Sequence, residues 1–321
     1  MKAIVRQRYG SPDILELKEV DKPTPKDNQV LVKVHAASVN PLDWHILRGQ
    51  PFPIRMMGFG LLKPKNQILG ADIAGRVEVV GKDVTLFKVG DEVFGMGMGS
   101  FAEYASIREN KLALKPAAIT FEQAAAVPVA GLTALQGLRD HGRIQPGYQV
   151  LINGASGGVG TFAVQIAKAM RAQVTGVCST KNIEMVRSIG ADQVIDYTQE
   201  EFWRSGKKYD LILDNAAYQS ISKSLGALKP HGIYIIVGGP TTIASLLLSL
   251  FFNPLISKLK RRKLVSFIAK LNQADLAVIG ELLQAGKIIP VIDRKYPLSE
   301  TPQAIRYIEE GHARGKVIIN I

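Results

Sequence analysis

Cysteine is almost missing from this chain of 321 residues, because Cys178 is its only thiol. A single cysteine excludes an internal disulfide and any metal site that needs several cysteine ligands. It also fits a reducing compartment, and the opening residues MKAIVRQRYG pass directly into a strand pattern without an apolar signal core. We therefore expect a cytoplasmic protein.

Long apolar runs are scarce, with one anomalous segment. Residues 241–256, TTIASLLLSLFFNPLI, fall short of the roughly 20 apolar residues that a membrane-spanning helix needs, and Pro254 interrupts them. The basic run KLKRRK follows at residues 258–263. This pairing is compatible with an interfacial membrane anchor, although an apolar lid or a subunit-contact helix with solvated charges is the preferred interpretation.

Nucleic-acid signatures are also missing. The chain carries 40 basic and 28 acidic residues, a formal charge of +12, but no basic segment interleaved with aromatic residues and no known nucleic-acid motif. We expect no nucleic-acid partner, and an anionic cofactor accounts equally well for the excess of positive charge. With 46% apolar and 21% charged residues, the composition is that of a globular protein, and the length predicts about two domains.

One stretch organises the rest of the chain. Gln149 to Asn153 and Gln173 to Cys178 have the pattern of short strands, and apolar residues at helical spacing lie between them. The small-residue turn after the first strand has the dinucleotide-binding spacing G/A-x-G-x-x-G. Its free helix-start N–H groups favour an anion, whereas the alternative is a turn that only packs a helix on a sheet. The predicted cofactor contacts are Ala155, Ser156, Gly157, Gly158, Val159 and Gly160.

The end of the second strand predicts which dinucleotide is bound. An Asp or Glu usually accepts there from a ribose 2′-hydroxyl, but this chain has Ser179, Thr180 and Lys181 and no carboxylate. Hydroxyls and an ammonium favour a 2′-phosphate, so we expect NADP(H). The alternative is an ordinary helix N-cap, with Glu184 completing a capping box.

The rest of the sequence predicts an α/β protein in two domains. Residues 1–35 and 68–94 have short β-branched runs separated by turn residues, and a further strand is expected at 100–107 after a glycine-rich loop, a pattern typical of a compact, barrel-like β domain. The character changes near Thr120, where a capping box opens an apolar helical segment. Strands at 193–196, 211–214 and 233–237 then alternate with helices, the rhythm of a doubly wound parallel sheet.

Several motifs in one order carry a family resemblance over essentially the whole chain. They are V-N-P-x-D (39–43), G-A-D-x-x-G (70–75), V-G-D-x-V-F-G (89–95), V-P-V-A-G-L-T-A-L (127–135), A-S-G-G-V-G (155–160), G-K-I-I-P-V-I-D (286–293) and G-H-A-R-G-K-V (311–317). The chain resembles the zinc-free quinone oxidoreductase-like branch of the medium-chain dehydrogenase/reductase superfamily. Within this branch it resembles quinone oxidoreductase homologues of the chloroplast envelope and alkenal or enone reductases.

The resemblance implies a β-rich, GroES-like catalytic domain from 1–124 and 270–321, with a Rossmann domain from 125–269 inserted between. It also implies a homodimer, often formed through an edge strand placed like 263–269. Zinc-dependent members carry a Cys and a His-Glu pair where this chain has Asn40 and Ala71-Asp72. We therefore expect no bound metal.

A reductase without a Lewis acid favours substrates in which the developing charge is delocalised, as in an enolate or a hydroquinone. The resemblance implies that Asn40 lies beside the nicotinamide or the substrate carbonyl, where its amide can donate; the alternative is a turn residue before Pro41. Asp43 is the third candidate catalytic residue, and the preferred interpretation is that it orders that loop and caps a helix rather than transferring a proton. His45 is either a donor or relay for protons or, as the preferred interpretation, a surface histidine.

Further cofactor contacts are implied by position. Thr133 matches a residue that contacts the nicotinamide carboxamide in relatives, and the alternative is a hydroxyl inside a helix that bonds back to its own turn. Tyr197 matches a residue at the 2′-phosphate, and the alternative is a tyrosine that only packs at a strand end. Residues at the ends of successive strands complete the set, because cofactors lie at the carboxyl ends of parallel strands: Asn215, Val237, Gly238 and Gly239.

The predicted function is NADPH-dependent, metal-free transfer of hydride to quinones or α,β-unsaturated carbonyls. The alternative is a catalytically weak regulator or membrane-associated protein of the same fold that binds NADPH.

Overall fold

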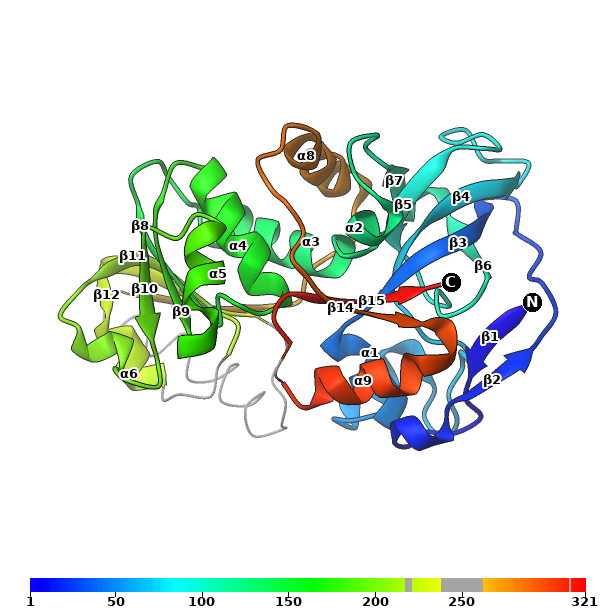
Figure 1. Ribbon diagram of the computed structural model, residues 1–321, viewed down its shortest axis with the longest axis horizontal. Helices are drawn as coiled ribbons and strands as arrows, with labels where there is room; N and C mark the ends of the chain where they lie inside the picture. Colours follow the sequence, from blue (N-terminus) through cyan, green and yellow to red (C-terminus); the bar gives the residue numbers. More distant parts are fainter. Residues whose placement is uncertain (217–220, 238–261, 312) are drawn as a thin grey trace. The chain divides into compact units, whose positions relative to one another are not determined.

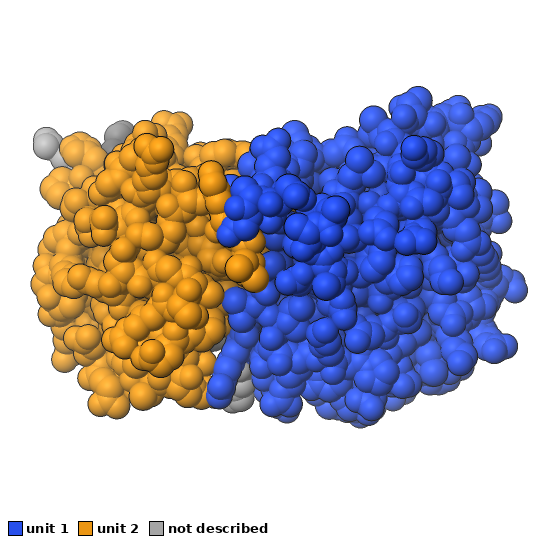
Figure 2. All heavy atoms as spheres, turned by 45° about the horizontal axis from the view of Figure 1, so that its top comes forward, with its two compact units in different colours: residues 1–129, 271–286, 290–321 blue, residues 130–270, 287–289 orange. Residues whose placement is uncertain are grey.

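The computed structural model describes residues 1–216, 221–237, 262–311 and 313–321 (Figure 1). The chain divides into two compact units, which are coloured separately in Figure 2. Unit 1 comprises Met1–Val129, Leu271–Gly286 and Pro290–Ile321, and unit 2 comprises Ala130–Lys270 and Lys287–Ile289. Gly238, Gly239 and the apolar segment 241–256 lie outside the described residues.

Unit 1 is built on a seven-stranded sheet whose order is β14-β15-β3-β4-β5-β7, with β6 paired to β3. The strands are β3 (Gln29–Val39), β4 (Asp72–Val80), β5 (Glu92–Met96), β6 (Tyr104–Arg108), β7 (Leu112–Leu114), β14 (Ile292–Pro297) and β15 (Lys316–Asn320). A separate hairpin pairs β1 (Lys2–Val5) with β2 (Glu16–Glu19). The carboxyl-terminal strand β15 therefore pairs with β3, although the two are far apart in sequence.

Short helices accompany this sheet: α1 (Pro41–Arg48), α2 (Phe121–Ala125), α8 (Gln273–Gln284) and α9 (Thr301–Glu309). Helix α1 begins immediately after β3, because Pro41 has no N–H to lose at a helix start. Helix α9 contacts α1, and the apolar side chains of both pack with Leu69 and Phe101 in one buried cluster. This packing fixes the end of β3, which is where the predicted catalytic residues lie.

Unit 2 is a fully parallel six-stranded sheet in the order β10-β9-β8-β11-β12-β13. The strands are β8 (Gln149–Asn153), β9 (Gln173–Cys178), β10 (Gln193–Asp196), β11 (Tyr209–Asp214), β12 (Leu228–Val237) and β13 (Lys263–Phe267). Its helices are α3 (Pro128–Gln136), which starts in unit 1, α4 (Gly158–Ala169), α5 (Ile183–Ser188) and α6 (Ile221–Gly226). The order reverses at β8, so the carboxyl end of this strand is the topological switch point of a doubly wound sheet.

These two units confirm the predicted fold class, which combines a Rossmann-type sheet with a β-rich domain. The capping box at Thr120 and the apolar helical segment after it are confirmed, and the segment is divided into α2 and α3 because Pro128 cannot continue a helix and instead starts a new one. The chain also crosses between the units at a place that was not predicted, because residues 287–289 return to unit 2.

In the part of the chain that the structure describes, no helix has the length and apolar character to cross a membrane.

Candidate functional site

The predicted dinucleotide turn joins β8 to α4 in the geometry that the glycine spacing requires. Gly157 is the N-cap of α4, and Ala155 N donates to Val177 O of the neighbouring strand at 2.9 Å. A Cβ on Gly160 would lie only 2.1 Å from the carbonyl oxygen of Gly154. Gly160 is therefore required by the protein itself, because only glycine lets the helix pack this close to the turn.

Gly157 is different, because the surrounding protein leaves room for a side chain. A Cβ there would meet nothing closer than Gly154 O, at an ordinary contact distance of 3.5 Å. The helix start beside it presents free backbone N–H groups, a natural binding site for an anion. The turn thus fits the pyrophosphate of a dinucleotide, which would occupy the space that a Cβ on Gly157 would fill.

The end of β9 differs from the prediction in one respect. The hydroxyl of Thr180 donates to Asp196 Oδ2 at 2.5 Å, so it is already committed within the protein. This bond and two from Thr198 hold the pKa of Asp196 below its usual range. Lys181 is exposed and has no ion-pair partner among the described residues. Lys181 and Ser179 therefore remain as groups that can bind a 2′-phosphate.

Asp196 was missed because it belongs to the next strand. The parallel register of β9 and β10 places Asp196 opposite Cys178, directly beside the loop that the sequence shows to lack a carboxylate. Only the strand pairing reveals this neighbour.

The remaining predicted cofactor residues are placed as follows. Asn215 follows β11, and its Nδ2 donates to the carbonyl oxygen of Asn153 at the end of β8 at 3.1 Å. Thr133 is buried in α3, and Val237 ends β12. Tyr197 is an exposed side chain whose backbone N–H donates to Cys178 O. All lie in unit 2.

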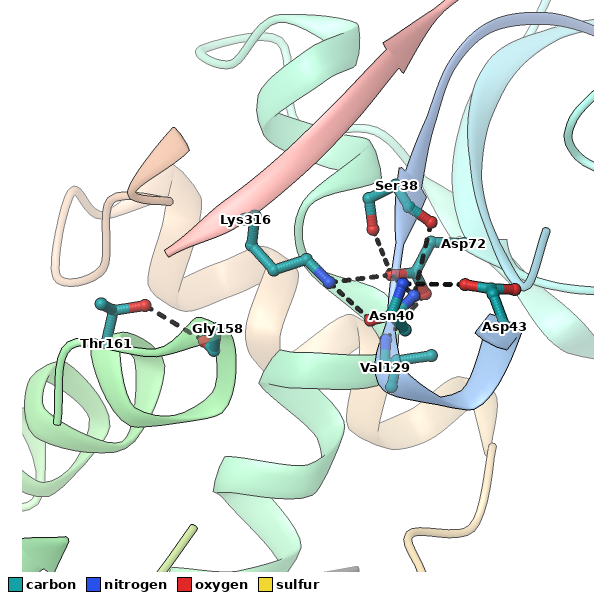
Figure 3. A network of polar contacts seen from close by, with 8 residues as sticks. All are labelled: Ser38, Asn40, Asp43, Asp72, Val129, Gly158, Thr161 and Lys316. Atoms are coloured by element: carbon teal, nitrogen blue, oxygen red, sulfur yellow. Dashed lines mark hydrogen bonds and ion pairs between the residues drawn. The ribbon is translucent and has the colours of Figure 1, made fainter. Parts of the chain in front are cut away.

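Unit 1 contains a buried polar cluster at the junction of β3, β4, α1 and β15 (Figure 3). Asp72 at the start of β4 is fully buried, and its Oδ2 accepts from Ser38 Oγ at 2.6 Å and from Asn40 Nδ2 at 2.9 Å. Its Oδ1 accepts from the backbone N–H of Val129 at 2.9 Å. Lys316, only 3% exposed, donates to Asn40 Oδ1 at 2.6 Å and lies 3.4 Å from Asp72 Oδ2.

This cluster compensates for its own desolvation. A buried carboxylate and a buried ammonium are each costly alone, but here every oxygen of Asp72 has a donor and Lys316 faces two acceptors. Sequence analysis missed Lys316 and Ser38 as members of the site. For Lys316 the sequence offered one signal, the lysine of the G-H-A-R-G-K-V motif. For Ser38 the signal is structural, because the pairing of β3 with β4 sets Ser38 opposite Asp72.

Comparison with known proteins matches both halves of the chain. Residues 26–117 match the model of the alcohol dehydrogenase GroES-like domain, and residues 189–319 that of the zinc-binding dehydrogenase family. The chain is 35% identical to the chloroplast envelope quinone oxidoreductase homolog of Arabidopsis thaliana, over 99% of this chain and 98% of that protein. It belongs to the medium-chain dehydrogenase/reductase superfamily.

Two further members of the superfamily are similar throughout. The NADPH-dependent alkenal/one oxidoreductase of Arabidopsis thaliana chloroplasts is 34% identical, over 99% of this chain and 79% of that protein. Among solved structures, the quinone oxidoreductase from Coxiella burnetii superposes with a TM-score of 0.88 at 32% identity, covering 100% of this chain and 99% of that one.

The zinc of other superfamily members does not fit the residues found here. Where a zinc ligand set would lie, the cluster of unit 1 has an amide, a hydroxyl, a carboxylate and the ammonium of Lys316, which already supplies a positive charge to Asp72. Among the described residues, no three His, Cys, Asp or Glu side chains gather closely enough to hold a metal ion.

The role that the superfamily resemblance implied for Asn40 conflicts with its contacts. Both amide hydrogens are engaged, one with Asp72 Oδ2 at 2.9 Å and one with Ser38 O at 3.4 Å, and Oδ1 accepts from Lys316. The side chain is 2% exposed. Asn40 therefore has no hydrogen left for a substrate oxygen in this arrangement, because its neighbours in space, which the motif does not show, compete for the amide.

His45 is half-buried and stacked on Trp44. Its Nδ1 lies 2.8 Å from the backbone oxygen of Gln50, which can only accept, so Nδ1 carries the hydrogen and Nε2 is left as an acceptor in the neutral ring. Burial lowers the pKa of His45. The neutral side chain thus has no second hydrogen to donate to an oxyanion near pH 7.

Asp43 is fully buried, and its Oδ2 accepts from the backbone N–H of Asn40 at 2.8 Å, which fixes the start of α1. Burial raises the pKa of Asp43 to about 7, with a further contribution from the nearby charge of Asp72. The other carboxyl oxygen has no partner among the described residues. Asp43 thus carries its proton at neutral pH far more readily than an exposed aspartate does.

Asp43 should therefore make stability depend on pH. Because its folded pKa, about 7, lies above the unfolded value of 3.8, the folded state binds more protons between these values, and stability from this group falls as pH rises from 4 to 7. The loss is at most roughly 4 kcal/mol. Urea unfolding of Asp43→Asn at pH 4.5 and 8 should show a clearly smaller loss of stability over that range than the wild type. Equal pH dependence in both proteins would contradict the assignment.

Proposed function

We propose that this protein is an NADPH-dependent reductase that transfers hydride to quinones or to α,β-unsaturated carbonyls, without a metal. The observation that carries the proposal is the turn after β8, which fits a dinucleotide pyrophosphate at the switch point of a parallel sheet. Superfamily members at about 35% identity over the full chain are named as quinone and alkenal oxidoreductases. NADPH supplies the hydride when bound.

The protein's own contribution is to bind and orient. The free N–H groups at the start of α4 hold negative charge, and the β-rich unit provides a rigid, internally satisfied polar cluster. The described residues provide neither a metal ligand set nor a free amide hydrogen at Asn40 to stabilise a localised oxyanion. Substrates that delocalise the charge themselves therefore suit this site best. Quinones and enones both do so.

The test is oxidation of NADPH by the purified, chelator-treated protein with a medium-chain 2-alkenal and, separately, with a simple benzoquinone. Reduction of the alkenal at its carbon–carbon double bond makes it an enone reductase, whereas turnover of the quinone alone makes it a quinone reductase. If NADPH binds but no compound in a wide panel of alkenals and quinones is reduced, the alternative of a catalytically weak NADPH-binding regulator is favoured.

The choice of NADPH over NADH is expected to depend on Lys181. Replacing this exposed ammonium by alanine removes a charge that attracts the 2′-phosphate, so the dissociation constant of NADPH should rise about tenfold and that of NADH less than twofold. Titration of cofactor fluorescence measures both. Lys63→Ala, at an exposed lysine of unit 1, is the matched control. A similar weakening of both cofactors would reject a contact with the 2′-phosphate.

Strand β13 is at one end of the described sheet of unit 2, which supports a homodimer that pairs two such edges. We further propose a cytoplasmic location.

A further inference from the structure

Asn182 is a buried residue that connects the two segments predicted to hold cofactor phosphates. Its side chain is 6% exposed, and its Nδ2 donates to Ser156 Oγ and to Ser179 Oγ, each at 3.1 Å. Ser156 belongs to the turn between β8 and α4, and Ser179 follows β9. The backbone N–H of Asn182 also donates to Ser179 O at 2.9 Å, which fixes the position of the amide.

The direction of these bonds sets the polarity of both hydroxyls. A hydroxyl has one hydrogen, and an oxygen that accepts from an amide keeps that hydrogen for another acceptor. Asn182 uses both of its amide hydrogens on the two serines, and its Oδ1 is buried without a partner in the described chain. Ser156 and Ser179 are only half-buried, so each keeps an accessible side from which it can donate.

We propose that Asn182 is a positioning residue that holds Ser156 and Ser179 as hydrogen-bond donors toward the cofactor phosphates. Ser156 serves the pyrophosphate and Ser179 the 2′-phosphate, so Asn182 contributes to the preference for NADPH over NADH. A phosphate only accepts, whereas a ribose 2′-hydroxyl also donates and is held by an acceptor in NAD-dependent proteins. This inference rests on the proposed function.

The test reverses the polarity with nearly the same shape. In Asn182→Asp, the carboxylate has no hydrogen and accepts from both serine hydroxyls, so the serines present lone pairs to the phosphates instead of hydrogens. The carboxylate also adds a negative charge near the phosphates. Calorimetric titration with 2′,5′-ADP, which carries the 2′-phosphate, should show a dissociation constant raised at least 30-fold. The constant for 5′-AMP, which lacks it, should rise less than fivefold.

Two comparisons separate positioning from a simple effect of charge. Ser188→Asp adds the same charge at the end of α5, away from both serines, and should change either constant less than threefold. In a Ser179→Ala background, Asn182→Asp should lose most of its selective effect on 2′,5′-ADP, because the hydroxyl through which it acts is gone. Ser179→Ala alone tests the same hydroxyl should the aspartate variant fail to fold: it should weaken 2′,5′-ADP selectively.

An unchanged ratio of the two constants in Asn182→Asp would overturn the inference, as would equal effects with and without the Ser179 hydroxyl. These results differ from a failure of the proposed function, in which the wild type itself binds neither 2′,5′-ADP nor NADPH.

Discussion

Gly160→Ala should destabilise unit 2 by more than about 3 kcal/mol, whereas Gly157→Ala should leave its stability within about 1 kcal/mol of the wild type. The reason is the neighbour that each new Cβ would meet. At Gly160 it would be 2.1 Å from a backbone oxygen, which has no room to move, and at Gly157 it would be 3.5 Å from the same atom. Urea unfolding of the two variants measures the difference.

The variant that keeps its stability, Gly157→Ala, is the one expected to lose NADPH affinity. Folded Gly157→Ala should bind NADPH at least 30-fold more weakly than the wild type, because its methyl group occupies the space assigned to the pyrophosphate. Circular dichroism confirms that the variant is folded before titration. Wild-type NADPH affinity in Gly157→Ala would place the cofactor elsewhere, and wild-type stability of Gly160→Ala would contradict the close packing of α4 on the turn.

Lys316→Met should cost about 3–5 kcal/mol of unfolding free energy, the typical penalty for removing one partner of a buried ion pair. The substitution leaves Asn40 Oδ1 without its donor and Asp72 with a charge that only neutral donors compensate. Lys295→Met is the control, because its pair with Glu122 is partly exposed and should contribute less than about 1 kcal/mol. Thermal or urea unfolding gives both values.

A double variant distinguishes the ion pair from the volume of the lysine side chain. Adding Asp72→Asn to Lys316→Met removes the uncompensated charge, so the pair of changes should cost clearly less than the sum of the two single ones. Strict additivity would show that Lys316 stabilises the unit by packing alone. A loss below about 1 kcal/mol for Lys316→Met would contradict the electrostatic account altogether.

Features set by neighbouring residues were predictable from the sequence. The turn at 154–160 and the strands at 173–178 and 193–196 all depend on local spacing and composition, and the structure has them where they were predicted. The switch point at β8 follows from the alternation of strands and helices, since a doubly wound sheet has few other arrangements.

Features set by distant partners were not predictable. Lys316 and Asn40 are 276 positions apart, and nothing in the local sequence of either shows that they meet. The same applies to Asp196, which register rather than sequence order places beside Thr180. Asn40 shows the consequence most clearly, because a motif identifies the amide but not the groups that compete for its hydrogens.

The return of residues 287–289 to unit 2 has a practical consequence. Gln165 in the middle of α4 is buried, and its amide exchanges two hydrogen bonds with the backbone of Ile289, at 2.8 and 3.0 Å. A fragment cut at the obvious ends of the Rossmann sheet would lack Ile289, which would leave Gln165 Oε1 without this donor and Nε2 with only its bond to the carbonyl oxygen of Thr161. Unit 2 is thus not one continuous segment of the chain, and transferring it into another protein requires residues 287–289 as well as residues 130–270.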